Sequence, residues 1–468
     1  MTDLVIVNPG GREIIYQGLG AELTGIEPPL WSRLVAGYCR DQGHSVQILD
    51  IEALNMPTDQ AIEEISSINP KLVAVVVHGH QPNSSAQQMA PASEFCRALK
   101  QARPDIPIAI AGGVVSALPE KIFKDEAVDY VIKGEGPKAI SMLVGSNLKP
   151  QIINDSATLD LDSELHGNVW DLLPMDRYRS HNWQVFDGSS RQPYAGIYTS
   201  LNCPYACSFC CISAPFGKSG YRTRSPSIVV KEVDHLYREY NVKTLRIIDE
   251  MFILKPSHYV PICEGLAALP FADELNIWAY ARVDTIKPET LSLLRRAGIR
   301  WICLGIESGS AHVRDGAKKT LDGDDIRNAV KSIQNAGINV LGNFMYGLPD
   351  DTMKSMRKTL DLAKSIECEY SNFYSAMPYP GSKLFDETPE KDLPTSWAGY
   401  SQHAYETTPL STATLSSRDV LKFRDDAFRE YFADPAYIDL VRRKFGDKAV
   451  KDIEEMTSYQ MRRALLES

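Results

Sequence analysis

The stretch Ser200–Gly217, SLNCPYACSFCCISAPFG, places four of the chain's nine cysteines within nine residues. Cys203, Cys207 and Cys210 have the spacing C-x3-C-x2-C. A [4Fe–4S] cluster with full thiolate ligation takes four cysteines. Three thiolates on one short loop can therefore hold such a cluster and leave one iron open, as a catalytic zinc site keeps a position open for a substrate. The spacing predicts an iron–sulfur cluster with an open iron.

Structural zinc is the alternative interpretation of the same cysteines. Such sites usually combine two C-x2-4-C pairs, or one pair with histidines at set spacing, and no second pair follows Cys210. Cys211 is predicted to pack instead of binding metal, because adjacent residues on a strand or tight loop point apart. Five isolated cysteines stand in apolar or helical surroundings and are predicted to be buried free thiols: Cys39, Cys96, Cys263, Cys303 and Cys368.

The composition is that of a large globular protein. The 468 residues allow more than one domain, and 44% apolar with 24% charged residues is ordinary for a protein with a buried core. A net charge of −10 disfavours a nucleic-acid partner, because phosphate binding needs clustered Lys and Arg. No apolar run approaches a membrane span, and the start MTDLVIVNPG lacks the features of a secretory signal. We expect a cytoplasmic protein with reduced cysteines and a small-molecule substrate, and no membrane partner.

Residues 1–145 alternate short apolar runs with helical patterns, which predicts βαβ units around a parallel sheet. The predicted strands are LVIVNP, SVQILD, LVAVVV, IPIAIAGG and DYVIKGEG. In open α/β sheets the ligand crevice lies beyond the carboxyl ends of the strands. The first domain is therefore predicted to be Rossmann-like, with room for a flat or nucleotide-like cofactor at this edge.

A second alternating series follows a less regular stretch, residues 146–193, which we interpret as a linker. Trp170 and Trp183 in that stretch are predicted to pack between domains. The second series contains six strand–helix units, which predicts a partial (β/α)6 barrel of the TIM type over residues 194–395. Residues 396–468 have the charge pattern of helices and are predicted to form a small helical C-terminal region. The fold class is therefore α/β.

Chemically reactive side chains fall at the predicted carboxyl ends of the barrel strands, where barrel enzymes build their active sites. They are Cys203, Asp249, Glu250, Arg282, Glu307 and Ser308. Taken singly, a carboxylate can be a rim charge or a helix cap, and the arginine can belong to a surface ion pair. Their shared position at strand ends favours chemistry over packing.

The second half of the chain resembles the radical S-adenosylmethionine superfamily. That family's hallmark is C-x3-C-x-aromatic-C at the end of the first barrel strand, and Phe209 supplies the aromatic residue here. Five further segments resemble the family's motifs in the family's order: IIDEMF, ARVD, GIESGS, GNFMYGLP and PYPGS. The resemblance implies that Cys203, Cys207 and Cys210 hold the cluster, whose open iron chelates S-adenosylmethionine. It also implies an external electron donor such as flavodoxin or ferredoxin, and cleavage of the cofactor to a 5′-deoxyadenosyl radical.

The resemblance further implies which residues hold S-adenosylmethionine. Arg282 would pair with its carboxylate in the bidentate manner of a guanidinium. Glu307 and Ser308 would bind its ribose hydroxyls. Asp249 and Glu250 would lie near its methionine end.

A Rossmann-like domain before a radical barrel resembles the cobalamin-binding subgroup of the superfamily. The segments IAGGVVSALPE and VIKGEGP match segments that this subgroup carries, and Gly112 with Gly113 would let the backbone approach a flat ligand. The D-x-H-x-x-G motif, which ligates cobalt in the methionine-synthase type of domain, is absent, because the chain has NPGGREIIYQGLG there. His78 and His80 lie near a strand end, and we expect satisfied polar residues at both positions. The axial ligation of cobalt stays open.

The predicted function is therefore that of a cobalamin-dependent radical S-adenosylmethionine methyltransferase. Its substrate would be an unactivated carbon or a phosphorus centre of a biosynthetic intermediate. The resemblance implies that one S-adenosylmethionine gives the radical and a second methylates cobalt, from which the methyl group passes to the substrate radical. A rearrangement or cyclisation with the same cofactors is one alternative, and a non-catalytic iron–sulfur protein is another. Candidate contacts to the substrate or between the domains are Tyr346, Tyr374, Tyr379, Tyr16, Gln17 and Glu27.

Overall fold

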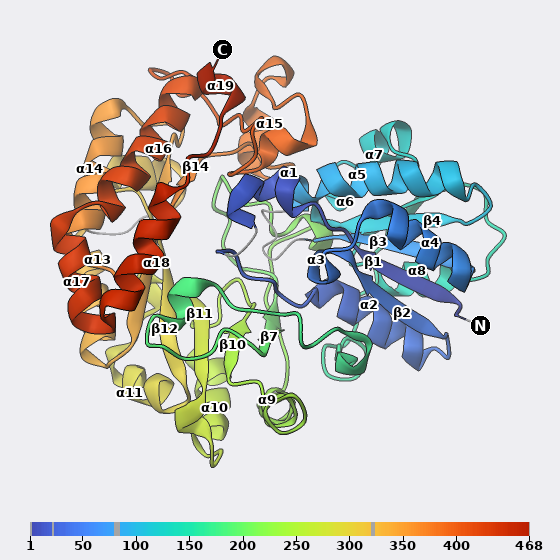
Figure 1. Cartoon of the computed structure of the whole chain (residues 1–468), viewed down its shortest axis with the longest axis horizontal. Helices are drawn as coiled ribbons and strands as arrows, with labels where there is room; N and C mark the ends of the chain where they lie inside the picture. The colour runs from blue at the N-terminus through green and yellow to red at the C-terminus, as the bar shows by residue number, and fades with distance from the viewer. Residues whose placement is uncertain (1, 21–22, 79–84, 320–322, 468) are drawn as a thin grey trace.

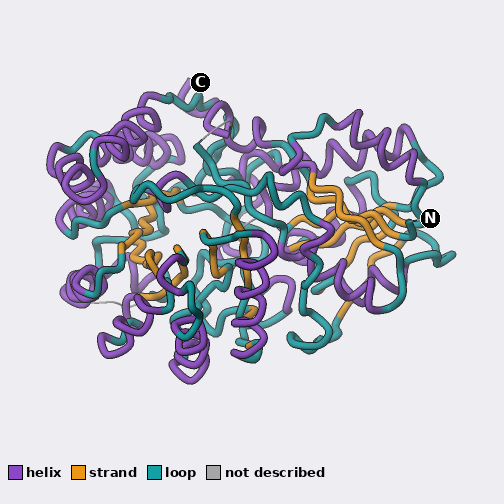
Figure 2. Tube along the Cα trace, turned by 60° about the horizontal axis from the view of Figure 1, so that its bottom comes forward, coloured by secondary structure: helices purple, strands orange, loops and turns teal. Residues whose placement is uncertain are grey.

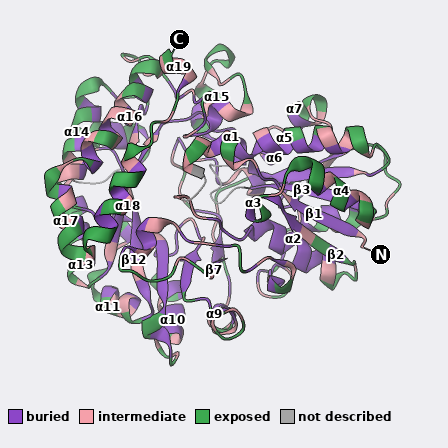
Figure 3. Cartoon of the chain, viewed as in Figure 1, coloured by how far each residue is buried: buried purple, intermediate pink, exposed green. Residues whose placement is uncertain are grey.

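The computed structural model describes residues 2–20, 23–78, 85–319 and 323–467. Two parallel sheets lie side by side, each covered by helices, and the last helices of the chain pack on the second sheet (Figure 1). The strands form two separate groups along the molecule (Figure 2). Buried residues concentrate on these strands and on the helix faces that turn toward them (Figure 3). The predicted α/β class is confirmed.

The first sheet has six parallel strands in the order β2-β1-β3-β4-β5-β6. The strands are β1 (Leu4–Asn8), β2 (Val46–Asp50), β3 (Leu72–Val77), β4 (Ile108–Gly112), β5 (Tyr130–Gly134) and β6 (Gln151–Asp155). Successive side chains of a strand point to opposite faces. Leu4 and Ile6 therefore pack with helix α2 (Leu30–Asp41), whereas Val5 and Val7 pack with α5 (Ser85–Ala102) on the other face. Because both faces are covered, the strands are nearly continuous apolar runs.

Shorter helices complete the first half of the chain. They are α1 (Arg12–Tyr16), α3 (Ile51–Leu54), α4 (Thr58–Ile68), α6 (Gly113–Ala117), α7 (Pro119–Asp125) and α8 (Pro137–Leu143). The strand β6 lies inside the stretch 146–193 that the sequence suggested as a linker. Its sequence QIIND pairs with β5 at the sheet edge, and most of its side chains are only partly covered. A short, half-polar edge strand gives a weak pattern, so the prediction ended this sheet one strand early.

The second sheet has the order β14-β13-β12-β11-β10-β7, so each strand pairs with the next large strand along the chain. The strands are β7 (Tyr194–Ile197), β10 (Thr244–Ile247), β11 (Asn276–Arg282), β12 (Ile299–Glu307), β13 (Asn339–Tyr346) and β14 (Tyr370–Ser375). All five pairings are parallel. The helices that follow these strands are α9 (Pro226–Tyr240), α10 (Pro256–Ala267), α11 (Pro288–Arg296), α12 (Ala311–Gly316), α13 (Gly323–Asn335) and α14 (Met353–Ser365). This is the predicted barrel-like arrangement of six strand–helix units.

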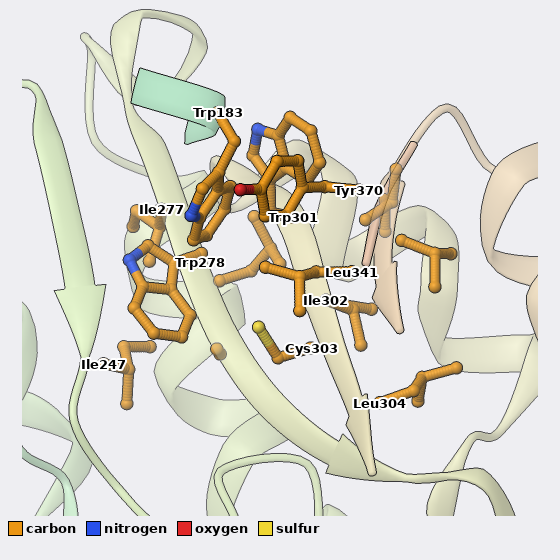
Figure 4. Packing of buried hydrophobic residues seen from close by; sticks show 14 of the residues in the cluster. Trp183, Ile247, Ile277, Trp278, Trp301, Ile302, Cys303, Leu304, Leu341 and Tyr370 are labelled. Carbon is orange, nitrogen blue, oxygen red and sulfur yellow. The ribbon is translucent and has the colours of Figure 1, made fainter. Parts of the chain in front are cut away.

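Trp183, in the short 3-10 helix Asn182–Val185, closes the base of the barrel. Its ring centroid is 5.4 Å from that of Trp278 and 5.1 Å from that of Trp301, both edge-on, and Figure 4 shows these rings together with Tyr370. Gln184 donates to one backbone carbonyl on β10 and to another on β11. Trp183 was predicted to pack between domains, but it packs inside the second one.

Trp170 does lie where the two halves of the chain meet. The guanidinium of Arg33, on α2, is 3.6 Å above its ring and donates to the carbonyl of Gly196 on β7 at 2.9 Å. Arg33 also pairs with Glu232 on α9 at 3.5 Å. This buried arginine joins the two sheets through one side chain.

The C-terminal helices are α15 (Lys383–Glu387), α16 (Ser417–Phe432), α17 (Pro435–Phe445), α18 (Asp447–Ser458) and α19 (Ala464–Glu467). Helix α16 packs on β14 and α14. The segment after α18 reaches back to the N-terminus, where the Gln17 amide donates to the carbonyls of His403 at 2.7 Å and Arg462 at 3.1 Å. None of the described helices has the length and apolar character needed to cross a bilayer.

Candidate functional site

The cysteine loop leaves the barrel between two short strands, β8 (Ser200–Leu201) and β9 (Arg222–Thr223). Asn202 begins the loop in the left-handed region with φ 70°, which asparagine adopts more readily than most residues. Its side-chain oxygen accepts from the backbone N–H of Cys203 at 2.8 Å, and its amide donates to the carbonyl of Lys218 at 2.8 Å. One side chain thus ties the start of the loop to its end. Sequence reasoning missed Asn202, whose place directly before Cys203 was the available signal.

Phe209 anchors the middle of the loop by packing with Val313 and Leu348. The backbone N–H of Cys210 donates to the carbonyl of Cys207 at 3.1 Å, so a tight turn brings these two residues onto one side of the loop. Cys211 belongs to a different cluster, the one built around β1, β3 and α5. The adjacent cysteines therefore point apart, and Cys211 is in a packing position.

Burial controls the chemistry of the three predicted cluster ligands. It raises the pKa of Cys203 to about 11, raises that of Cys207, and raises that of Cys210 well above the ordinary range for a thiol. A metal ion deprotonates a coordinating thiol outright, so this pocket suits thiolates only when a cation accompanies them. Within the described ranges, no three His, Cys, Asp or Glu side chains converge on a position for a single ion. Separate thiolates on one short loop instead suit a multi-iron cluster.

Arg282, at the end of β11, lies directly against the cysteine loop. Its Nη1 is 4.0 Å from the sulfur of Cys207, and its guanidinium is 4.0 Å above the ring of Tyr205. Nε and Nη2 donate to the two carboxylate oxygens of Asp284 at 2.9 Å and 3.0 Å. The bidentate partner in this structure is therefore an internal carboxylate. Tyr205 and Asp284 were not predicted, although each lies two residues from a predicted one.

Glu307, at the end of β12, has φ 67° and forms a buried ion pair. Lys319 Nζ is 2.6 Å from its carboxylate, and the two side chains are 7% and 9% exposed. The pair covers Gly305, where an added Cβ would lie 2.5 Å from Nζ. Lys319 lowers and Glu307 raises the pKa of Cys207, so both charges act on the cysteine loop. Lys319 belongs to no motif, and sequence reasoning missed it.

Ser308 follows Glu307 in the chain, but its side chain does not face the cysteine loop. Its side chain is fully buried, with Oγ 3.2 Å from Oγ1 of Thr359, and it accepts from the backbone N–H of Ser310 at 3.1 Å. The hydroxyl that was expected to bind a ribose is used inside the protein. This geometry favours a structural role for Ser308.

Asp249 and Glu250 follow β10. Like Ser308 and Glu307, one of the two is used inside the protein and the other lies toward the cysteine loop. The Asp249 carboxylate is buried and accepts from the backbone N–H of Thr199 and the hydroxyl of Ser200, each at 2.6 Å. It therefore holds the chain just before the cysteine loop. Glu250 is half-buried, and burial raises its pKa to about 8. Its charge raises the pKa of Cys203, which places Glu250 toward the loop.

The predicted cofactor edge of the first domain lies beside the cysteine loop. At Gly112 an added Cβ would lie 2.0 Å from the carbonyl oxygen of Val77, so only glycine fits there. Gly113 begins α6, and α6 packs against the 3-10 helix Ala214–Phe216 that ends the cysteine loop. The two predicted cofactor positions are therefore neighbours across the domain boundary.

The other predicted contacts fall in three places. Glu27 is paired with Arg246 of β10 at 2.5 Å, inside the interface between the domains. Tyr16 and Gln17 instead face the C-terminal region, where the ring of Tyr16 is 5.6 Å from that of His403. Tyr346 meets Phe423 of α16 at 5.0 Å, which places it outside the barrel.

Tyr374 lies on β14 of the barrel sheet, whereas Tyr379 packs in the cluster built around β1, β3 and α5. On β14 the half-buried residues are Asn372 and Tyr374, which alternate with buried residues on the other face. Asn372 donates to Asn343 on β13 at 3.1 Å. Tyr379 accepts from the amide of Gln402 at 3.2 Å. Tyr374 thus shares its strand face with two linked amides.

Two family models match the chain. Residues 16–144 match the B12 binding domain, and residues 197–363 match the Radical SAM superfamily. The first range ends after β5, and the second includes the cysteine loop. The two matches fall on the two sheets that the structure shows.

Two curated relatives align with most of this chain. An uncharacterized methyltransferase of Pyrococcus horikoshii is 26% identical over 408 residues, which cover 82% of this chain and 82% of that protein. The anaerobic magnesium-protoporphyrin IX monomethyl ester cyclase of Rubrivivax gelatinosus is 23% identical over 461 residues, which cover 92% of this chain and 79% of that protein.

The same two-domain fold occurs in a solved structure. The radical S-adenosylmethionine methyltransferase TsrM from Kitasatospora setae, with tryptophan substrate and a cofactor analog bound, aligns over 98% of this chain and 99% of that chain. The TM-score is 0.65 at 17% identity. A second TsrM structure, with cobalamin and a [4Fe-4S] cluster bound, has a TM-score of 0.63. With a B12 binding domain followed by a radical SAM domain, the chain is a cobalamin-dependent radical S-adenosylmethionine enzyme, and its cofactors are a [4Fe–4S] cluster, S-adenosylmethionine and cobalamin.

Proposed function

We propose that the protein is a methyltransferase that acts on an unactivated carbon or a phosphorus centre of a biosynthetic intermediate. One observation carries the proposal: the helix that begins at Gly113 packs on the segment that ends the cysteine loop. A corrin ring at the edge of the first sheet and a cluster on the loop would then face one shared space. The Pyrococcus horikoshii relative, itself named a methyltransferase, supports the same assignment.

Three residues would hold the cluster: Cys203, Cys207 and Cys210. When bound, the cluster and S-adenosylmethionine supply a 5′-deoxyadenosyl radical, and cobalamin supplies the methyl carrier. The chain's own part is to bind, position and shield these groups. Phe209 and the other apolar residues behind the loop keep water from that side.

Residues that face the loop would hold S-adenosylmethionine. Arg282 has Nη1 beside Cys207, while Asp284 fixes its other nitrogens. It would orient the carboxylate of the cofactor next to the open iron. Glu307 would accept from the ribose hydroxyls, and Glu250 would lie near the methionine amino group. Asp249 and Ser308 would act through the backbone that they fix.

The edge of the first sheet would take the corrin ring. Gly112 and Gly113 keep that edge free of side chains, and Ser116 secures it by donating to the carbonyl of Gly134 at 3.2 Å. A flat macrocycle needs such a smooth backbone surface. The fit of the residues present to cobalamin is therefore good.

The substrate would enter the barrel over Tyr374. That face of β14 presents an aromatic ring together with the linked amides of Asn372 and Asn343. Rings and amides suit a small molecule with an apolar body and a few polar groups. We place the reaction in a reducing compartment, the cytoplasm, because the described cysteines are all free thiols. The electron that reduces the cluster would come from an external donor such as flavodoxin or ferredoxin.

The test is an anaerobic reconstitution with iron, sulfide and hydroxocobalamin, followed by desalting. About one corrin and about four irons per chain are expected, as for one cobalamin and one cluster. Incubation with S-adenosylmethionine, a reductant and candidate substrates should yield both 5′-deoxyadenosine and S-adenosylhomocysteine. C207A should lose iron and both products, whereas the adjacent C211A should keep them. Product formation by C207A equal to that of C211A would contradict the cluster assignment.

A rearrangement or cyclisation with the same cofactors is the second candidate function. The cyclase from Rubrivivax gelatinosus, which covers 92% of this chain, is the observation that favours it. The two functions differ in one product, because only methyl transfer consumes a second S-adenosylmethionine as methyl donor. Turnover that yields 5′-deoxyadenosine without S-adenosylhomocysteine would select the cyclase type.

A further inference from the structure

A polar group without a hydrogen-bond partner can receive a ligand only where it is open to a space. His78 of the first domain was expected to be a satisfied polar residue, but its Nε2 is buried and has no partner among the described residues. Its ring is stacked on that of Trp31, with centroids 4.3 Å apart. His80 lies outside the described residues. Polar groups that are both unpaired and open lie instead inside the barrel.

The barrel strands leave an open space between them. Successive side chains of a strand point to opposite faces. The interior face includes Trp278 and Tyr370, whose rings contact Trp183 at the base of the barrel (Figure 4). Because the outer faces are covered by helices, partly covered residues within these strands indicate room in the interior. Beyond the first two residues of each strand, the half-buried positions of β11 to β14 all belong to the interior face: Tyr280, Gly305, Met345, Asn372 and Tyr374.

Two amides on this interior face are linked by one hydrogen bond. Asn372 Nδ2 donates to Asn343 Oδ1 at 3.1 Å. A carboxamide has two N–H donors and one carbonyl acceptor. The amino group of Asn343 and the carbonyl oxygen of Asn372 therefore stay without a partner among the described residues, and neither atom is fully buried. The linked amides offer a ligand one donor next to one acceptor.

The charged residues that point inward from the described strands are already neutralised. Each one has an oppositely charged partner. The three pairs are Arg246–Glu27 at 2.5 Å, Arg282–Asp284 at 2.9 Å and Glu307–Lys319 at 2.6 Å. An ionised substrate group would lose its hydration without gaining a free opposite charge, which is costly. The interior therefore suits an uncharged group.

We propose that Asn343 and Asn372 determine substrate specificity by binding an uncharged planar group that carries a hydrogen-bond donor next to an acceptor. A carboxamide and the lactam edge of a heteroaromatic ring share this chemistry. Asn343 donates to the carbonyl oxygen of the group, and the N–H of the group donates to the carbonyl oxygen of Asn372. The rings of Tyr280 and Tyr374 contact the apolar body of the substrate. A molecule without the group leaves both amides unpaired, which is how such sites discriminate.

The inference rests on the proposed function, because it takes the barrel interior as the substrate site. Its test uses fluorinated probes that differ in one group: 4-fluorobenzamide, 4′-fluoroacetophenone, which lacks the donor, and 4-fluorobenzoate, which is charged. Fluorine NMR titration of the reconstituted full-length protein, loaded with cobalamin and S-adenosylmethionine but without reductant, gives the dissociation constants. 4-Fluorobenzamide should bind about 10-fold more tightly than either analogue, as expected for one hydrogen bond. Equal affinities, tighter binding of the benzoate or no binding of the benzamide would overturn the proposal.

A lactam probe separates the two sources of the same chemistry. Tighter binding of 5-fluoro-2-pyridone than of 4-fluorobenzamide would support the lactam edge, and the reverse order would support a carboxamide. Neither measurement involves turnover. Formation of S-adenosylhomocysteine tests methyl transfer separately, so failure of the proposed function and failure of this inference are distinguishable.

A charge change at Asn343 locates the probe. Asn343→Asp keeps the oxygen that accepts from Asn372 but replaces the amino group with a second acceptor. The variant should bind 4-fluorobenzamide about 10-fold more weakly and the cationic 4-fluorobenzamidine about 10-fold more tightly than the unmodified protein does. Asn335→Asp, the same change at the exposed end of α13, is the matched control and should alter neither constant. Equal probe affinities in Asn343→Asp and Asn335→Asp would exclude Asn343 as the selecting residue.

Discussion

Arg282 Nη1 lies 4.0 Å from the sulfur of Cys207, while Nε and Nη2 of the same guanidinium donate to the carboxylate of Asp284. The guanidinium is therefore fixed beside the thiol of Cys207, on which the charges of Glu307 and Lys319 also act. A fixed positive charge favours the thiolate form of a neighbouring cysteine. The geometry makes Arg282 the link between the cluster loop and the site proposed for S-adenosylmethionine.

Replacing Arg282 with lysine should weaken cofactor binding. Lysine keeps the charge but loses both the bidentate contact to Asp284 and the stacking on Tyr205. We expect the dissociation constant for S-adenosylmethionine to rise about 10-fold or more, because one charge-assisted hydrogen bond is lost. Equilibrium dialysis with reconstituted protein measures it. Arg238→Lys, in a surface pair with Asp234, is the matched control, and equal affinities of the two variants would argue against this role.

Replacing Asp249 with asparagine should reduce iron retention. The carboxylate accepts hydrogen bonds from Thr199 and Ser200, and an amide would direct N–H groups at the same donors. The expected cost is about 1–3 kcal/mol, borne by the segment that leads into the cysteine loop. Iron per chain after desalting is the measurement, with the exposed Asp273→Asn as control. Iron content equal to that of the control would show that Asp249 does not position the loop.

Removing only one partner of the Glu307–Lys319 pair should lower the free energy of unfolding. Lys319→Met leaves a buried carboxylate without its partner, which costs about 3–5 kcal/mol in the free energy of unfolding. The double variant Lys319→Met with Glu307→Leu should recover most of that loss, because no buried charge remains. Urea unfolding of the apo protein measures both. An equal loss in the single and double variants would contradict a pairwise interaction.

Acid should destabilise the apo protein partly through His403. Burial lowers its pKa from an ordinary 6.5 to about 3, with Arg424 and Arg463 acting in the same direction. The folded state therefore favours the neutral ring, and this stability is present above pH 6.5 and is lost as the pH falls toward 3. At pH 5 the loss is at most about 2 kcal/mol. The drop in unfolding free energy between pH 7 and pH 5 should be smaller in His403→Phe. An equal drop would place the acid sensitivity elsewhere.

Removing Trp183 should open the base of the barrel. Its ring contacts Trp278, Trp301 and Tyr370, and truncating a buried tryptophan to alanine costs about 3–5 kcal/mol. Thermal unfolding of Trp183→Ala should show a much lower midpoint than Trp397→Ala, whose side chain is half-buried. Similar midpoints would mean that Trp183 does not support the barrel.

The sequence by itself determined the helices and strands, and it determined which strand ends hold the chemically reactive side chains. Short, nearly continuous apolar runs separated by helical patterns identify the strands without reference to the rest of the chain. Cysteine spacing is equally local, so Cys203, Cys207 and Cys210 could be placed on one loop. The order of the motifs then identified a barrel and a preceding cofactor domain.

Only the tertiary structure decided which side chains share a space and what each one contacts. Arg282 and Asp284 are close in sequence, but the sulfur beside them belongs to a loop 75 residues away in the chain. Ser308 follows Glu307 directly and yet points into the protein, because neighbouring residues at a strand end face opposite ways. Such contacts depend on the packing of distant segments, which local patterns do not encode.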